Sequence, residues 1–190
     1  MKILSNIITT TMILIVITSM LGCRTSTLYS DELNTKNFSC EDKHQINKQD
    51  IIKIHPQDVK DCFLSDTNKI TWIIFYYNDC TKDIAREVAI YKEYQERLNF
   101  LIISTTYDIA DVLRESHEIN YPIYFISKEV KCDCMRRNLR AFTDSLFNNN
   151  PASKDAGKYM NLFIDKNEII YLADSVNRDL ISEIMNNAKN

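Results

Sequence analysis

The chain has 190 residues, with 23 lysines and arginines against 26 aspartates and glutamates and a formal net charge of −3. This acidic balance, in a sequence where no basic patch stands out, argues against a nucleic-acid partner. The two glycines are too few for a glycine-rich loop that cradles a nucleotide, and the sequence predicts no cofactor.

The first 22 residues predict an export signal peptide. Lys2 supplies a positive charge, the run from Ile7 to Leu21 is apolar and threonine-rich without any charge, and Gly22-Cys23 follows. This is the order of a secretory signal. The run of about 15 residues is shorter than the roughly 20 that a helix needs to cross a bilayer. We therefore expect cleavage, with an uncleaved N-terminal membrane helix as the alternative.

The end of this segment carries a lipid-attachment pattern. The sequence Ser19-Met20-Leu21-Gly22-Cys23 resembles the lipobox of bacterial lipoproteins, in which the cysteine receives a diacylglycerol before cleavage. The resemblance implies that Cys23 becomes an acylated, palmitate-bearing N-terminus. More than one acyl chain gives stable anchoring, so we expect a lipoprotein that lies on a membrane surface without crossing it.

Residues 23–48 predict the lipidated cysteine and a flexible tether, because Arg24 to Lys48 is polar and lacks a sustained apolar period. Residues 49–190 then form the folded domain. Arg24 is not the aspartate that retains enteric lipoproteins at the inner membrane. We therefore expect a cell-envelope protein on the outer membrane, with its domain in the periplasm or at the surface.

Strands and helices are expected to alternate through this domain. The predicted strands cover 49–54, 70–77, 100–105, 124–126, 160–164 and 168–172, the last two joined by a hairpin turn at Asp165-Lys166-Asn167. The predicted helices cover 56–64, 83–98, 109–117, 135–147 and a last one that Ser175 caps and that runs to about residue 188. This order predicts an α/β sandwich with a mixed sheet.

Three local motifs agree with that order of elements. Phe75 to Asp83 looks like a strand that ends in the active-site loop of thioredoxins, Asn161 to Ile170 like their late hairpin, and Tyr121 to Phe125 like a strand opening of the redoxin and TlpA-type branch. Residues 49–188 thus resemble the thioredoxin-like lipoproteins of Bacteroidota. The resemblance implies a thioredoxin-like three-layer α/β/α sandwich and makes Cys80 the candidate nucleophile.

The sequence also departs from this family. The second cysteine of Cys-x-x-Cys falls at Asp83, and without it a dithiol enzyme cannot resolve its mixed disulfide in the ordinary way. The proline that faces the active cysteine would lie near Tyr159, where none occurs; Pro122 begins the preceding strand instead. A helix N-terminus lowers the pKa of the Cys80 thiol, whereas neighbouring aspartates raise it, so its reactivity stays open.

Four further cysteines accompany Cys80 once the lipidated Cys23 is set aside. These five are an odd number, so at least one thiol has no partner inside the chain. One assignment leaves Cys80 free and pairs the other four, with Cys40–Cys62 among the options. The closely spaced Cys132 and Cys134 have three readings: a strained, labile redox pair, a thiol that resolves Cys80, or structural cysteines.

For two other groups of residues we expect no metal or binding site. His44, His55 and His117 are scattered without ligand spacing, so no metal is expected. Arg136, Arg137 and Arg140 read as the solvated face of a helix.

Two functions stay open. One is a membrane-anchored thiol–disulfide oxidoreductase that acts on envelope protein thiols through Cys80. The other is a catalytically inactive thioredoxin-like domain used as a binding or scaffold lipoprotein, since fold does not fix function.

Overall fold

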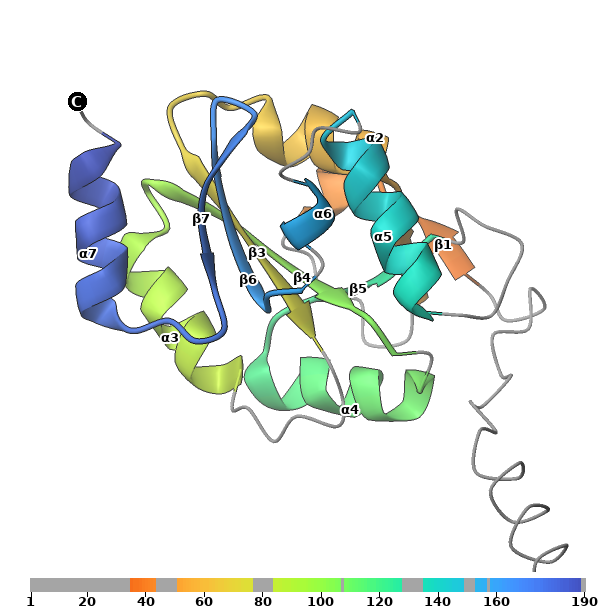
Figure 1. Ribbon diagram of the computed structural model, residues 1–190. Coiled ribbons are helices and arrows are strands. Elements are labelled where there is room, and N and C mark those ends of the chain that lie inside the picture. Colours follow the sequence, from red (N-terminus) through yellow and green to blue (C-terminus); the bar gives the residue numbers. More distant parts are fainter. Residues whose placement is uncertain are drawn as a thin grey trace, which may run out of the picture. The chain divides into compact units, whose positions relative to one another are not determined.

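The computed structural model describes residues 35–43, 51–76, 84–106, 108–127, 135–148, 153–156 and 158–188. In this part of the chain, seven strands form one sheet in the order β1-β2-β5-β4-β3-β6-β7 (Figure 1). The strands are β1 (Thr35–Asn37), β2 (Ile51–Ile54), β3 (Ile70–Tyr76), β4 (Leu98–Ser104), β5 (Ile123–Ile126), β6 (Asn161–Asp165) and β7 (Glu168–Ala173). The helices are α2 (Pro56–Val59), α3 (Ile84–Tyr94), α4 (Ile109–Ile119), α5 (Met135–Leu146), α6 (Ser153–Ala156) and α7 (Arg178–Asn187). A 3-10 turn, η1 (Cys40–Asp42), follows β1, and a π-helical turn, η2 (Lys60–Leu64), extends α2.

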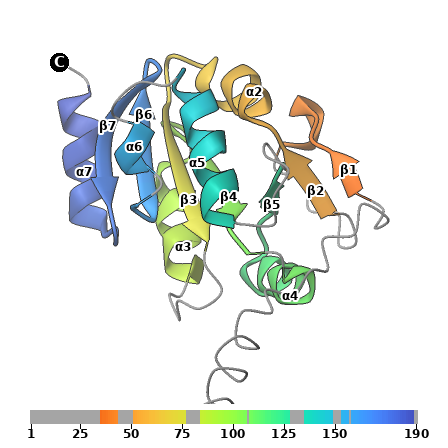
Figure 2. The ribbon, with the colours of Figure 1, turned by 45° about the vertical axis from the view of Figure 1, so that its right-hand side comes forward.

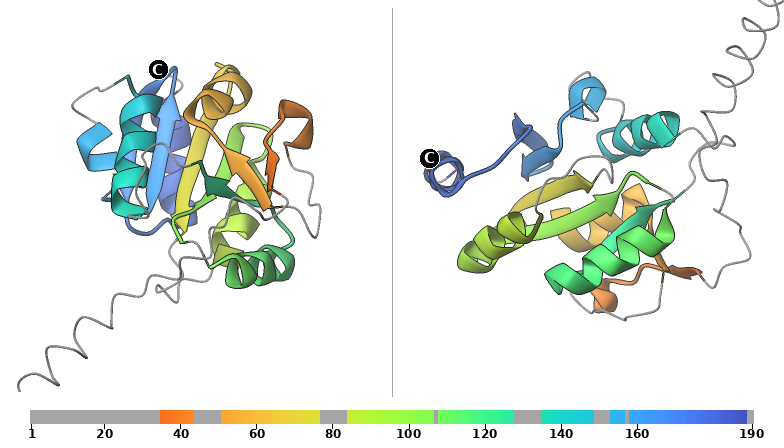
Figure 3. Two further views of the ribbon diagram at one scale, coloured as in Figure 1. Left: turned by 90° about the vertical axis from the view of Figure 1, so that its right-hand side faces the viewer. Right: turned by 90° about the horizontal axis from the view of Figure 1, so that it is seen from below.

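The sheet is mixed, with helices on both of its faces. β1, β2, β5, β4 and β3 are parallel neighbours, whereas β6 runs antiparallel to β3, and β7 runs antiparallel to β6. Helices α2, α5 and α6 lie on one face, and α3, α4 and α7 on the other (Figures 2 and 3). This is an α/β three-layer sandwich of the thioredoxin-like kind that the sequence predicts, with β5 as an additional strand between β4 and β2.

The central strands β3 and β4 are buried along their whole length. Alternate residues point to opposite faces of a sheet, and here both faces are covered. On the α5 side, Ile73 and Phe75 of β3 pack in one core with Leu139 and Phe142. Continuous apolar sequence is what a strand between two helical layers requires, and this explains the composition of 70–76.

Aromatic rings fill the core on the opposite face. Trp72 stacks on Phe163 at 5.3 Å between ring centroids and lies 4.8 Å from Phe100. Phe100 in turn stacks on Tyr91 of α3 at 4.7 Å, and Tyr121 lies 5.2 Å from Phe100. The rings therefore join β3, β4 and β6 to α3, and they bury large apolar areas.

The predicted hairpin joins β6 to β7, and its turn residues explain its tightness. Lys166 and Asn167 both have positive φ, 47° and 68°. Two such residues between antiparallel strands are the signature of a type I′ turn, whose twist matches that of the flanking strands. The turn predicted at Asp165-Lys166-Asn167 is therefore confirmed.

Several helix boundaries differ from the prediction, and two of the differences have a clear structural reason. The last helix is capped by Asn177, whose Oδ1 accepts from the backbone N–H of Leu180 at 2.8 Å, and not by Ser175. Ser175 is exposed in a bend, and Val176, between the two, is buried. Helix α3 ends at Tyr94 because Leu98 already pairs with Ile70 in the sheet.

Residues 35–43 form regular structure, although the sequence placed them in the tether. Residues 35–37 pair in parallel with 51–53. Phe38 is buried and packs edge-on against Tyr124 at 5.2 Å and beside Phe63 at 5.6 Å. One phenylalanine within a polar stretch gives no periodic signal, and for that reason the sequence pattern did not reveal this strand.

Candidate functional site

The parallel strands present their carboxyl ends at one edge of the sheet. Tyr76 of β3 lies beside Ser104 of β4, and Ser104 lies beside Phe125 of β5. In open α/β sheets, ligands and reactive groups gather outside the carboxyl ends of the strands. This edge is therefore the candidate site.

Two cysteine-bearing segments attach at this edge. Segment 77–83, which holds Cys80 and Asp83, joins the end of β3 to the start of α3, and segment 128–134, which holds Cys132 and Cys134, joins the end of β5 to α5. These four residues lie outside the described residues, as does Cys23. The positions at which both segments begin and end are nevertheless defined.

The last residue of β3 is firmly held. The carbonyl of Tyr76 accepts from the backbone N–H of Thr105 at 2.8 Å and from its hydroxyl at 2.7 Å. Burial raises the pKa of the Tyr76 hydroxyl, and the carboxylates of Glu115 and Asp111 raise it further. Segment 77–83 thus begins at a strand end whose carbonyl is fixed by two hydrogen bonds.

The chain reaches the same edge again just before β6. The carbonyl of Met160 accepts from the backbone N–H of Phe75 at 2.8 Å. Tyr159 and Met160 directly precede β6, where the sequence resemblance led us to expect a proline, and the backbone there pairs with β3. Pro122 directly precedes β5, as predicted.

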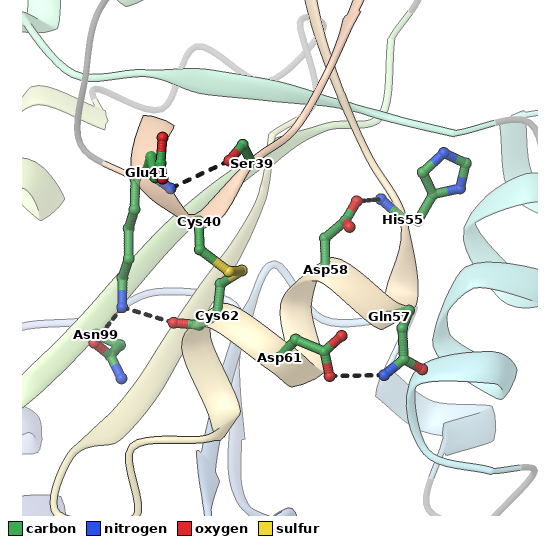
Figure 4. Close-up of a disulfide and its surroundings, with 10 residues drawn as sticks. Ser39, Cys40, Glu41, His55, Gln57, Asp58, Asp61, Cys62 and Asn99 are labelled. Carbon is green, nitrogen blue, oxygen red and sulfur yellow. Dashed lines mark hydrogen bonds between the residues drawn. A yellow bond between two sulfur atoms is a disulfide. The ribbon is translucent and has the colours of Figure 1, made fainter.

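Cys40 and Cys62 are joined by a disulfide with 5.3 Å between their Cα atoms (Figure 4). This is one of the pairings that the cysteine count left open. The carbonyl of Phe63, next in the chain, accepts from Thr71 Oγ1 at 2.8 Å and Asn99 Nδ2 at 2.7 Å. Thr71 and Asn99 are the second residues of β3 and β4, so the disulfide lies toward the amino ends of these strands.

Lys43 completes this cluster. Its Nζ donates to the carbonyl of Cys62 at 2.9 Å and to Asn99 Oδ1 at 3.0 Å, and it lies 4.6 Å from the centre of the Phe63 ring. Burial lowers the pKa of Lys43, and the charge of Lys69 lowers it further. Sequence reasoning missed this lysine, although Asn99, a polar residue within the buried strand β4, was a signal that something polar packs there.

The remaining candidates carry no site. Arg136, Arg137 and Arg140 are exposed on α5, as expected for a solvated face. Within the described ranges, histidine, cysteine, aspartate and glutamate form no group of three that could hold a metal ion. An open cavity of about 390 Å³ lies beside Lys60, but this ammonium already donates to Ser145 O, at the end of α5, and to Asn148 Oδ1.

In the ranges described, every helix is too short or too polar to cross a membrane. Comparison with models of known protein families, with curated proteins and with solved structures found no match. The class of protein is therefore defined by the architecture: an α/β sandwich compatible with the thioredoxin-like fold, with one disulfide in its described part.

Proposed function

We propose that this chain is a lipid-anchored, thioredoxin-like protein of the bacterial cell envelope that exchanges disulfides with envelope protein thiols through Cys80. The single observation behind the proposal is that segment 77–83 joins the carboxyl end of β3 to the start of α3, between the described residues Tyr76 and Ile84. That junction is where thioredoxin-like proteins hold their nucleophile, and a helix start favours a thiolate.

The second thiol would come from segment 128–134. Only β4 separates β3 from β5, so the ends of the two strands lie about 10 Å apart. Cys132 or Cys134 would then take the role that Asp83 cannot fill.

The proposed exchange needs only the thiols of this protein and the disulfide of its partner. The Cys80 thiolate attacks one sulfur of a partner disulfide, which forms a mixed disulfide and releases one partner thiol. Attack on Cys80 by Cys132 or Cys134 releases the second partner thiol and leaves a disulfide in this protein. The partner gains the two electrons that the protein loses.

The Cys40–Cys62 disulfide supports a location outside the cytoplasm, but it takes no part in the proposed exchange. Disulfides persist in oxidising, extracytoplasmic compartments. The neighbouring Phe63 contacts Thr71, which lies about 16 Å from Tyr76 along β3, and both sulfurs are already bonded to each other.

One observation favours the alternative of a binding or scaffold lipoprotein. The residue just before β6 is Met160, whose carbonyl pairs with Phe75 of β3. Thioredoxins present a proline there to a substrate backbone. Without it, and with Asp83 in place of a resolving cysteine, the fold could bind a partner and leave its disulfides unchanged.

Insulin reduction and mixed-disulfide trapping with the purified full chain test the proposal. Cys80→Ser should abolish both signals, whereas replacing the resolving cysteine, Cys132→Ser or Cys134→Ser, should accumulate the mixed disulfide. The matched control, Cys40→Ser with Cys62→Ser, should leave trapping at Cys80 in place. Equal activity in wild type and Cys80→Ser, or none in either, would remove the catalytic function and favour the alternative.

Anchoring is tested separately. Growth with an alkyne analogue of palmitate should label the wild-type chain, and Cys23→Ser should lose both the label and sedimentation with membranes. A wild-type chain without label would contradict the anchor and leave the domain's thiol chemistry as a separate question.

A further inference from the structure

Residues 35–43, which we name the clasp segment, attach to the domain by strand pairing, by the buried ring of Phe38 and by hydrogen bonds from Lys43. Three of its residues pair with β2, on the outer edge of the sheet. Phe38 inserts between Phe63 and Tyr124, and Lys43 caps the Cys62 carbonyl. So short a strand is weakly held by pairing alone.

The Cys40–Cys62 disulfide is the covalent attachment of this segment, and it closes a loop with a sequence separation of 22 residues. Residues 51–62 of this loop remain folded in β2, α2 and η2, so the chain-entropy relation applies to the shorter remainder and favours the closed arrangement on the order of 100-fold. The disulfide therefore adds substantially to the attachment that strand pairing and Phe38 provide.

The two sulfurs differ in ways that favour reduction from one side. Cys40 is exposed, whereas Cys62 is partly buried against the core. A dithiol can thus approach Cys40 with Cys62 as the leaving group. The Lys43 ammonium, 2.9 Å from the Cys62 carbonyl, brings a positive charge to the residue that would carry the thiolate, and stabilised thiolates leave faster.

We propose that the Cys40–Cys62 disulfide is a redox-operated latch that holds the clasp segment on β2 and that a dithiol reductant releases. One thiolate of the reductant attacks Cys40 Sγ, the bond to Cys62 breaks, and Cys62 takes up a proton. The second thiol of the reductant then attacks the mixed disulfide, frees Cys40 as a thiol and leaves the reductant as a disulfide. Release uncovers the edge of β2 and the place of Phe38.

Amide hydrogen exchange of the protein tests the latch. The full chain is used with Cys80, Cys132 and Cys134 all replaced by serine, so that a dithiol such as dithiothreitol changes only this disulfide. Reduction should raise the exchange rate of the Phe38 amide on the order of 100-fold and leave the amides of β3 and β4 protected. Unchanged protection of Phe38, with both thiols shown free by alkylation, would overturn the proposal.

The role of Lys43 is tested by measuring how fast the Cys40–Cys62 disulfide is reduced. Lys43→Met should slow reduction by dithiothreitol several-fold, whereas the matched control Lys158→Met, an exposed lysine paired with Asp155, should not. Equal rates in Lys43→Met and wild type would remove the lysine from the proposal.

Discussion

The indole Nε1 of Trp72 donates a hydrogen bond to Asn161 Oδ1, 3.0 Å away, between β3 and β6. Trp72 is fully buried and Asn161 is 3% exposed, so water cannot replace either group. A buried indole N–H needs a partner, and β6 supplies it. This bond therefore ties the antiparallel hairpin to the parallel part of the sheet.

Replacing Asn161 should leave the indole N–H without a partner. We expect Asn161→Leu to lower the free energy of unfolding by about 1–3 kcal/mol, measured by urea unfolding. In a Trp72→Phe background, where no N–H remains to be satisfied, the same change should cost less. An equal loss in both backgrounds would contradict the assignment.

Strongly apolar strands and the hairpin were predictable because each carries its own local signal. The buried run 70–76 and the Asp165-Lys166-Asn167 turn follow from β-branched composition and from turn residues. The clasp segment was not predictable, since its structure depends on Phe38 reaching Phe63 and Tyr124, which lie far along the chain. Local sequence patterns do not indicate contacts between residues that are distant in the chain.

The first turn of α7 offers a matched pair of variants. Asn177→Ala removes the side chain that accepts from Leu180 N–H and should destabilise the protein by about 1 kcal/mol. Ser175→Ala, at the position that the sequence pattern favoured as the cap, should change stability little. Thermal unfolding of both variants measures this, and a larger loss from Ser175→Ala would show that the helix begins earlier.

A substitution in the β6–β7 turn is expected to stabilise the protein. Glycine adopts positive φ without the steric cost that a Cβ brings, a cost that asparagine bears less than other residues, and Asn-Gly is the preferred pair in type I′ turns. Asn167→Gly should therefore raise stability by up to about 1 kcal/mol, whereas Asn167→Ala should lower it. Urea midpoints compare the two, and a loss with glycine would argue against the φ of 68° at this position.

The candidate site was predictable in outline and not in detail. Cys80 stays a prediction, drawn from a strand, a cysteine and a helix that follow one another in the sequence. That β5 would lie beside β4, and so attach segment 128–134 at the same edge as segment 77–83, depends on strand pairing. The polar cluster of Lys43 and Asn99 depends on pairing in the same way.

Tyr121 predicts how stability changes at alkaline pH. Its hydroxyl donates to the carbonyl of Phe100 at 3.0 Å, and burial holds its pKa well above the ordinary value of 10.0. The unfolded chain therefore releases this proton first, so the stabilisation is complete below pH 10.0 and is lost as pH rises toward the folded pKa.

Tyr121→Phe cannot ionise and separates this effect from the hydrogen bond. At about pH 8 the variant should be less stable by about 1 kcal/mol, because the Phe100 carbonyl loses a partner. Between about pH 10 and 11 wild type should lose up to about 1.4 kcal/mol more than the variant, the limit for one proton per pH unit. Urea unfolding across this range measures the difference. Parallel losses would show that Tyr121 ionises as readily in the folded protein as in the unfolded chain.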